Sequence, residues 1–224
     1  MGNKHLVITI SHQLGSGGAY LGQKLSERLG LPFIDRDVLK KVAEQLNLAE
    51  AVLDGREERL STFWQSLMRI AAFTDPVKCL SLDSYLPSDR ELFKLESDYI
   101  GRIADKSSAI FFGRCGRYIL RAHPGHISIL VHANLPDRIK RIQQLYCFGE
   151  DEAKKLIETN DRERTAYMRA FTRQDWLDAR WYDLCVNTSS LGLEKVVEIA
   201  QTLIMELADA RKIGLWQLDR QAAL

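Results

Sequence analysis

The segment LVITISHQLGSGG, residues 6–18, joins an apolar, β-branched run to a glycine-rich turn. The residues that follow keep a helical period, because leucines recur at i, i+4 and i+8 from Leu21 onward until Gly30 provides a stop. A strand, a glycine-rich turn and a helix in this order bind anions well, since free backbone N–H groups and the helix N-terminus point at the ligand. The segment therefore predicts a phosphate-binding loop over residues 11–18.

The turn departs from the Walker A pattern G-x-x-x-x-G-K-[ST] at an informative position, because Gly18 stands where that pattern has its lysine. A dinucleotide-binding loop is the alternative. Gly15 and Gly17 would supply its first two glycines, and Asp35 lies 20 residues after Gly15, as a ribose-binding acid would. Tyr20 occupies the place of the third glycine, so this match is partial.

The composition limits the class of protein. With 224 residues, 46% hydrophobic and 27% charged, the chain has the make-up of one well-cored globular domain. A net charge of +1 gives no bulk attraction to nucleic acid or to an anionic membrane, so we expect neither as a partner. The four cysteines form no CxxC pair, which argues against a zinc site, and we expect no metal-ligating residue. With no apolar leader or membrane-spanning run, a cytoplasmic protein is expected.

Five short apolar runs alternate with helical patterns along the chain. The runs begin near residues 6, 31, 108, 127 and 182, and the fourth follows a turn at residues 123–126 (HPGH). Helical patterns occupy residues 37–74, 89–103, 118–122, a segment after Asn134, residues 150–172 and the segment that begins at Leu193. This alternation predicts an α/β protein with a five-stranded parallel sheet and helices on both faces. The carboxyl ends of its strands would gather the candidate site loops at one edge.

Arginines are concentrated before the last predicted strand. Four of them, Arg162, Arg164, Arg169 and Arg173, fall within twelve positions. On a helix the first, third and fourth share a face, whereas Arg164 points elsewhere. The cluster is either a solvated helix face or a movable segment that neutralises a transferring phosphoryl group. Arg169 and Arg173 have no acid four residues earlier, which favours the second interpretation.

Other polar residues at strand ends each allow two interpretations. Arg114 follows a buried strand and would either form an ion pair or face an anionic ligand. Arg138 and Arg141 follow the fourth strand and are predicted to be surface charges of the next helix. Asp35 would bind a substrate hydroxyl or base amine, or cap a helix. His12 would donate to a phosphate or remain a plain loop residue.

Five blocks of sequence occur in a fixed order: residues 10–18 (ISHQLGSGG), 33–35 (FID), 113–115 (GRC), 160–164 (NDRER) and 182–192 (YDLCVNTSSLG). Together they resemble the cytidylate kinase-like family of P-loop proteins over nearly the whole chain. The resemblance implies a three-layer P-loop NTPase fold in a single domain of residues 1–224, with a helical monophosphate-binding insert at 37–106 and a lid-like segment at 148–175. It also implies phosphoryl transfer from ATP, with Mg²⁺, to a nucleoside monophosphate, and we predict CMP.

The resemblance further implies a role for each matched position. The loop residues Ser11, His12, Gly15, Ser16, Gly17, Gly18 and Ala19 would bind ATP, with Asn187 and Ser190 near the adenine. The residues Asp35, Arg114 and Arg169 would bind the monophosphate substrate. Catalysis would rest on Arg114, Arg162 and Arg164.

Two positions depart from the family pattern. True cytidylate kinases have a lysine at the place of Gly18 and a magnesium-binding hydroxyl residue at the place of Tyr20, and relatives without the lysine carry an arginine at the place of His12. The sequence therefore leaves as alternatives a nucleotide-binding protein with weak or no kinase activity and, less favoured, a dinucleotide-dependent oxidoreductase. The apolar residues of segment 215–218 (LWQL) would pack either in the core or on a second subunit of a homodimer.

Overall fold

The computed structural model describes residues 5–35, 88–113 and 115–213. The chain divides into two units, Met1–Ile34 with Ile100–Leu224 and Asp35–Tyr99. Most of the predicted insert, Arg114 and the apolar segment 215–218 lie outside the described residues. The strands are β1 (Val7–His12), β2 (Phe33–Ile34), β3 (Ala109–Phe112), β4 (His126–His132) and β5 (Leu184–Asn187). The helices are α1 (Gly18–Leu29), α5 (Ser88–Lys106), α6 (Gly116–Ile119), α7 (Leu135–Tyr146), α8 (Glu150–Thr172), the 3₁₀ turn η2 (Ala179–Trp181), α9 (Thr188–Leu191) and α10 (Leu193–Ala210).

The five strands form one sheet in the order β2-β3-β1-β4-β5, and every neighbouring pair is parallel. β1 is the central strand, paired with β3 from Val7 and with β4 through His12. Since all strands run the same way, their carboxyl ends share one edge, and β1 reaches that edge directly before the glycine-rich turn. The predicted parallel α/β sheet is confirmed.

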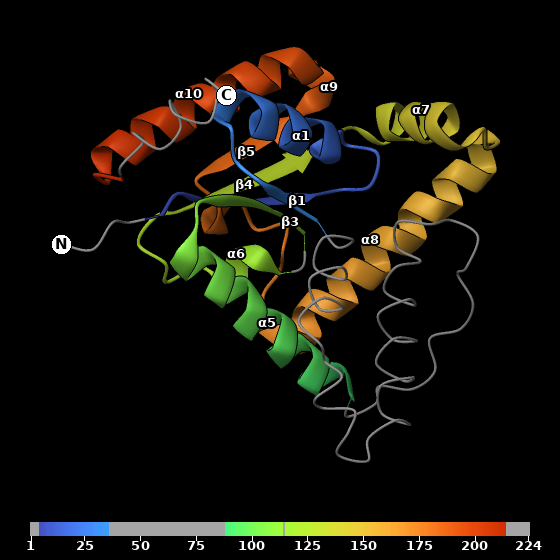
Figure 1. Ribbon diagram of the computed structural model, residues 1–224. Helices are drawn as coiled ribbons and strands as arrows, with labels where there is room; N and C mark the ends of the chain where they lie inside the picture. The colour runs from blue at the N-terminus through green and yellow to red at the C-terminus, as the bar shows by residue number, and fades with distance from the viewer. Residues whose placement is uncertain (1–4, 36–87, 114, 214–224) are drawn as a thin grey trace. The chain divides into compact units, whose positions relative to one another are not determined.

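The main core lies between the sheet and two helices. Alternate β1 residues such as Ile8 and Ile10 are buried against Leu25 of α1 and Val197 and Ile204 of α10. Figure 1 shows α1 and α10 together on one side of the sheet and the short α6 on the other. Fully burying an aliphatic side chain of this size contributes roughly 1.5–3 kcal/mol. This core fixes the start of α1, and with it the turn that precedes the helix.

α7 and α8 form a helical hairpin with a small core of its own, Ile139 and Ile142 against Ala153 and Ile157. α7 ends at Tyr146, and the next residue, Cys147, caps it with a left-handed φ of 57°. Three carboxylates occupy the first turn of α8, where their negative charge interacts favourably with the helix dipole and stabilises the helix. The helix predicted over residues 150–172 is confirmed with those bounds.

Two boundaries differ from the sequence prediction. The short helix α6 begins at Gly116 because Cys115 takes a left-handed φ of 55° and the Gly116 N–H donates to the Gly113 carbonyl at 3.0 Å. His126, expected in a turn, belongs to β4 and is buried, and its Nε2 lies 2.7 Å from Thr9 Oγ1. Among the described helices, none is long and apolar enough to cross a membrane.

Candidate functional site

The glycine-rich turn has the conformation that a phosphate-binding loop requires. Gly15 and Gly17 have φ of 77° and 86°, a left-handed conformation that side chains other than hydrogen disfavour. The Ser16 N–H closes the turn on the Gln13 carbonyl at 3.0 Å, and the Gln13 N–H ties it to the Val131 carbonyl of β4 at 3.0 Å. The turn thus leads from β1 into the N-terminus of α1, as predicted.

Several backbone N–H groups of this turn are left for a ligand. Within the described residues, the N–H groups of Gly15, Gly17 and Gly18 have no backbone or side-chain acceptor. The buried Oγ of Ser16 and the buried Nδ1 of His12 also have no hydrogen-bond partner there. Convergent free donors at a helix N-terminus form an anion site, because the helix dipole adds to their partial charges.

Close packing excludes side chains from the glycine positions. A Cβ on Gly17 would lie 2.3 Å from Leu193 Cδ2. A Cβ on Gly18 would lie 2.4 Å from His12 Cβ, although Gly18 itself begins an ordinary helix. The His12 ring in turn stacks on Phe112, with ring centroids 4.2 Å apart. A lysine at position 18 is therefore incompatible with the observed packing of His12.

Three arginines hold the carbonyl groups of the turn. Arg138 of α7 donates from Nε to the Leu14 carbonyl at 2.6 Å, and Arg141 donates from Nη1 to the Gly15 carbonyl at 3.1 Å. Arg164 of α8 donates from Nη1 to the His12 carbonyl. Because arginines of α7 and α8 donate to the carbonyl oxygens of the turn, its N–H groups keep an orientation that suits a bound ligand.

The prediction that Arg138 and Arg141 are surface charges is wrong. Arg138 is 4% exposed and forms a bidentate ion pair with Asp161, both N–O distances being 2.8 Å. Arg141 is half-buried, and its Nη1 also donates to Thr188 Oγ1 at 2.9 Å. Thr188 Oγ1 donates in turn to the Ser16 carbonyl at 2.8 Å. The position of these arginines on a predicted surface helix does not reveal the hydrogen bonds that they donate to the turn.

Arg164 and His12 differ in the charge that their side chains carry at neutral pH. Burial and the nearby Arg138 lower the pKa of Arg164 to about 10, so its guanidinium stays charged at neutral pH. The Arg164 guanidinium also lies 5.3 Å from the centre of the Trp176 ring. Burial, Arg164 and Arg138 lower the pKa of His12 well below its ordinary value, so its imidazole is neutral. The positive charge next to the turn therefore comes from α8 and α7.

The profile of the cytidylate kinase-like family matches residues 7–190 of this chain. The chain belongs to this family. Cytidylate kinases of Methanobrevibacter smithii and Ignicoccus hospitalis are each 22% identical over 200 residues, covering 89% of this chain and 98% and 99% of those proteins.

An uncharacterised protein from Eubacterium ventriosum has a TM-score of 0.67 at 20% identity, covering 89% of this chain and 98% of that one. At these identities the solved structures show the fold, and the cytidylate kinase-like family supports a phosphotransferase in general. The three-layer P-loop fold predicted for the chain is thereby confirmed.

The remaining positions taken from the cytidylate kinase-like family pattern are spread over the described structure. Arg162 and Arg169 are exposed on α8, and Arg162 Nη2 lies 3.3 Å from Thr159 Oγ1. Asn187 caps α9 through its Oδ1, which accepts from the Ser189 N–H at 2.9 Å. Of the other predicted site residues, Ser11 lies in β1 next to its last residue. Ala19 is exposed on α1, Ser190 is exposed on α9, Asp35 follows β2 in the chain and Arg114 lies outside the described residues. Their roles stay predictions.

The described residues provide few side chains that could coordinate Mg²⁺ directly. Tyr20, which stands where the family pattern has a metal-binding hydroxyl, donates its own hydroxyl to Glu194 of α10. Within the described part of the chain, no group of three His, Cys, Asp or Glu side chains is placed to hold a metal ion. In a kinase Mg²⁺ takes most of its ligands from phosphates and water, so any Mg²⁺ here would arrive with the nucleotide.

Proposed function

We propose that this member of the cytidylate kinase-like family transfers the γ-phosphoryl group of ATP to a nucleoside monophosphate, with CMP as the acceptor. The observation that carries the proposal is the turn between β1 and α1. Its free N–H groups converge at a helix N-terminus, while half-buried guanidinium groups hold its carbonyl groups. That combination suits a polyphosphate better than a neutral ligand.

The charge balance beside the turn supports phosphate binding despite the absence of the Walker lysine. Arg138 is neutralised by Asp161. Arg141 and Arg164 contact only neutral oxygen atoms and rings, and neither forms an ion pair within the described residues. A buried guanidinium without a carboxylate is costly, and a phosphate oxygen would compensate it. We propose that these two cations supply the charge that a lysine at position 18 would otherwise provide.

Catalysis in this proposal is positioning and charge stabilisation, without a covalent intermediate. The turn would hold the β- and γ-phosphates, and Arg141 and Arg164 would counter the charge spread over the transferring group. We propose Arg162 and Arg169 as further cations of the lid-like segment 148–175, which reach the phosphoryl group when it closes. Bound water would then be kept from competing with the acceptor.

The acceptor is inferred from likeness. The two relatives quoted above bear the name cytidylate kinase, and both align along nearly their full length. In the resemblance, Asp35 and Arg114 contact the monophosphate, and we propose that they do so here. CMP is accordingly the first acceptor to test, ahead of other pyrimidine and purine monophosphates.

One experiment separates the alternatives. Titration calorimetry with ATP, CMP and NAD is run beside a coupled assay for ADP formation with CMP, UMP, dCMP, AMP and GMP. The proposal expects ATP binding and ADP release that depends on CMP. ATP binding without turnover on any acceptor would instead establish a nucleotide-binding protein, and NAD binding without ATP binding an oxidoreductase.

The first of these alternatives has an observation in its favour. Both positions at which a P-loop kinase usually contacts the β- and γ-phosphates or the metal are altered, since Gly18 carries no charge and the Tyr20 hydroxyl is bound to Glu194. A removed donor of this kind commonly costs about 3 kcal/mol of transition-state stabilisation. The assay above therefore includes long incubations, so that slow turnover is measured rather than missed.

A further inference from the structure

A second hollow lies at the opposite end of the central strands, where β4 begins. Its volume is about 360 Å³, within the range of small-molecule sites. It is lined by Arg117, Arg121, His123, Pro124, His126, Ser128, Arg180, Trp181, Tyr182, Asp183 and Arg211. β4 contributes His126 to this hollow. The same strand bonds the phosphate-binding turn at Val131, which lies roughly 17 Å from His126 along the strand. No residue of the phosphate-binding turn lines the hollow, and Tyr182 of the hollow is linked to the start of that turn by a hydrogen bond with Ser11.

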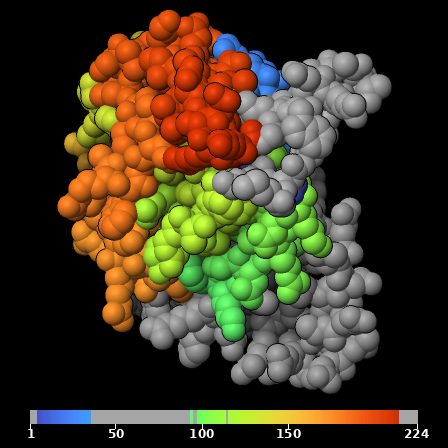
Figure 2. All heavy atoms as spheres, turned by 90° about the vertical axis from the view of Figure 1, so that its left-hand side faces the viewer, coloured from blue at the N-terminus to red at the C-terminus, as the bar shows by residue number. Residues whose placement is uncertain are grey.

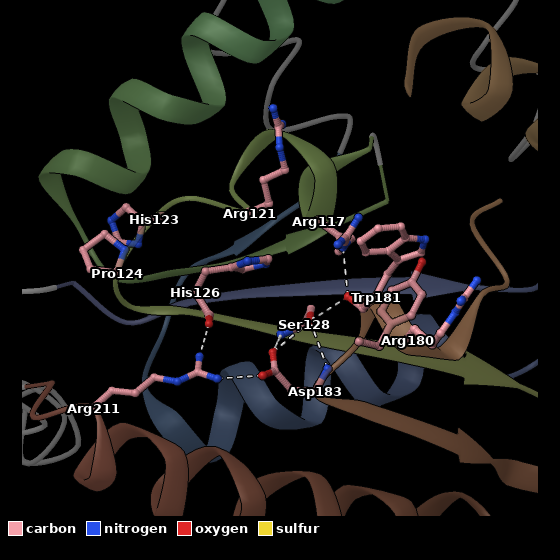
Figure 3. Close-up of a pocket in the computed structure, with 11 residues that line it drawn as sticks. Arg117, Arg121, His123, Pro124, His126, Ser128, Arg180, Trp181, Asp183 and Arg211 are labelled. Atoms are coloured by element: carbon pink, nitrogen blue, oxygen red, sulfur yellow. Dashed lines mark hydrogen bonds and ion pairs between the residues drawn. The ribbon is translucent and has the colours of Figure 1, made fainter. Parts of the chain in front are cut away.

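The hollow is open on the surface. Figure 2 shows this side of the molecule, where the end of α10 (red), the chain between β3 and β4 (yellow-green) and the segment before β5 (orange) come together. Figure 3 shows Arg211 and Asp183 along one side of the hollow, and Arg117 and Trp181 along another. Segments distant in sequence thus bring their charged side chains to one concave surface.

The charges in this hollow do not balance. Four arginines line it against one carboxylate, that of Asp183. This carboxylate already accepts from the Ser128 N–H and Oγ at 2.8 Å each and from Arg211 Nη2 at 2.6 Å. Burial lowers the pKa of His123, and burial with Arg117 and Arg211 lowers that of His126 to about 4. Both histidines are therefore neutral at pH 7, and the excess positive charge belongs to the arginines.

Arg117 is the residue that most needs an anion. It is only 9% exposed, yet its Nε donates to the Trp181 carbonyl at 2.9 Å and its Nη1 to Gln174 Oε1 at 2.7 Å, both neutral acceptors. Its guanidinium lies 4.7 Å from the centre of the Trp181 ring. Within the described residues it forms no ion pair. Arg138, which is more deeply buried at 4% exposed, is paired with Asp161, so this chain does compensate a buried guanidinium where no ligand is needed.

Arg121 follows the end of α6 and, unlike Arg117, is exposed. Its Nη1 donates to the Tyr118 carbonyl, and its guanidinium lies 4.1 Å from the centre of the Tyr118 ring. It too forms no ion pair among the described residues. Arg180, at the other side of the hollow, is mostly exposed and paired with Asp178. Two guanidinium groups without carboxylates thus line the same hollow, next to the partly exposed ring of Trp181.

We propose that this hollow binds a small anion that carries phosphate groups, at a site separate from the phosphate-binding turn. Guanidinium groups match phosphate oxygens with two parallel hydrogen bonds, and the excess charge favours a di- or triphosphate over a single carboxylate. Trp181 offers a face on which a planar part of such a ligand would stack. The proposal does not depend on which reaction the chain catalyses.

The test uses inorganic pyrophosphate and the fluorescence of Trp181 in the full chain. Trp181→Phe is titrated in parallel, so that the difference between the two curves reports on the hollow alone. We expect a saturable difference signal for the wild type. Arg121→Gln removes an exposed cation with little risk to folding, and it should weaken pyrophosphate binding about tenfold or more, since a charge-assisted hydrogen bond is lost. Arg117→Gln should weaken it further.

Two controls make the result decisive. Arg102→Gln removes an exposed arginine of α5 outside the hollow and should leave the signal unchanged. Arg164→Gln removes a cation of the phosphate-binding turn and should also leave the Trp181 signal unchanged. Absence of a saturable signal in the wild type overturns the proposal. So does a signal that survives Arg121→Gln and Arg117→Gln, or one that Arg164→Gln abolishes, because the pyrophosphate would then be bound elsewhere.

Discussion

The guanidinium group of Arg164, on α8, donates a hydrogen bond to the backbone carbonyl of His12, at the end of β1. This contact joins two residues 152 positions apart and brings a half-buried positive charge beside the glycine-rich turn. The His12 side chain meanwhile fills the space next to Gly18. We propose that the arginines supplied by α7 and α8 provide the positive charge that a lysine at position 18 would bring to the turn.

Substitution of Arg164 should therefore harm catalysis more than folding. Arg164→Gln keeps a hydrogen-bond donor but removes the charge, and we expect kcat for phosphoryl transfer to fall about 100-fold. Steady-state kinetics with ATP and CMP measure the change, and circular dichroism confirms the fold.

Lys155→Gln is the matched control for Arg164, since it removes one exposed charge from the same helix. It should leave kcat within about twofold. An equal loss in both variants would mean that only the net charge of α8 matters, contrary to the role given to Arg164.

The crowding at Gly18 can be tested by adding one methyl group. Gly18→Ala places a Cβ 2.4 Å from His12 Cβ, and we expect a loss of about 1–3 kcal/mol in the free energy of unfolding. Gly101→Ala, in open space on α5, should be neutral or stabilising by up to about 1 kcal/mol. Urea unfolding of both variants gives the comparison.

A double-mutant cycle then identifies His12 as the cause. In a His12→Gly background, Gly18→Ala should cost close to nothing, because the opposing Cβ is gone. If the alanine costs as much as before, the clash lies elsewhere and the explanation for the missing lysine is wrong.

The two aspartate–arginine pairs should differ sharply in their contribution to stability. Asp161→Asn leaves the buried Arg138 guanidinium without its carboxylate, and we expect a loss of about 3 kcal/mol in the free energy of unfolding. Asp178→Asn breaks a pair whose arginine is 87% exposed and should have a far smaller effect. Chemical denaturation at pH 7 measures both, and similar losses would refute the distinction.

His126 should make stability depend on pH. Its pKa is about 4 in the folded chain and near 6.5 when unfolded, so the unfolded state gains a proton first as the pH falls. The stabilisation from keeping His126 neutral is complete above pH 6.5 and is lost progressively toward pH 4. Between pH 7 and 5 we expect the chain to lose about 2 kcal/mol through this residue.

His126→Gln keeps a polar partner for Thr9 but cannot titrate, so its loss over the same interval should be smaller by that amount. Unfolding curves at pH 7 and pH 5 for both proteins provide the measurement. Identical pH dependence would show that His126 does not hold its low pKa.

The sheet and the turn could be predicted because they follow from local pattern. The signals are local: they are the apolar runs, the glycines at 15 and 17 and the helical period from Leu21. The parallel direction of the strands follows from the alternation of strands and helices along the chain. Periodicity predicted the α8 bounds for the same reason. The start of β4 differs from the prediction, since His126 contacts Thr9 and no local pattern reveals that contact.

The arginines show the limit of that approach. The helical wheel grouped Arg162, Arg169 and Arg173 and set Arg164 apart, yet Arg164 is the one that contacts the turn. The sequence predicts a surface charge at Arg138, because nothing near it in the sequence shows that Asp161 lies opposite. Which face of a helix is covered depends on the hairpin of α7 and α8, and that is decided by packing.

The most direct test of the central claim follows the phosphoryl group itself. The purified chain is incubated with CMP and ATP labelled at the γ-phosphate, and the labelled products are separated. If the chain transfers the γ-phosphoryl group to CMP, we expect labelled CDP to form in the same amount as ADP, and we expect Arg164→Gln to lose this product. Bound ATP that never transfers its label to CMP or to any other nucleoside monophosphate would contradict it.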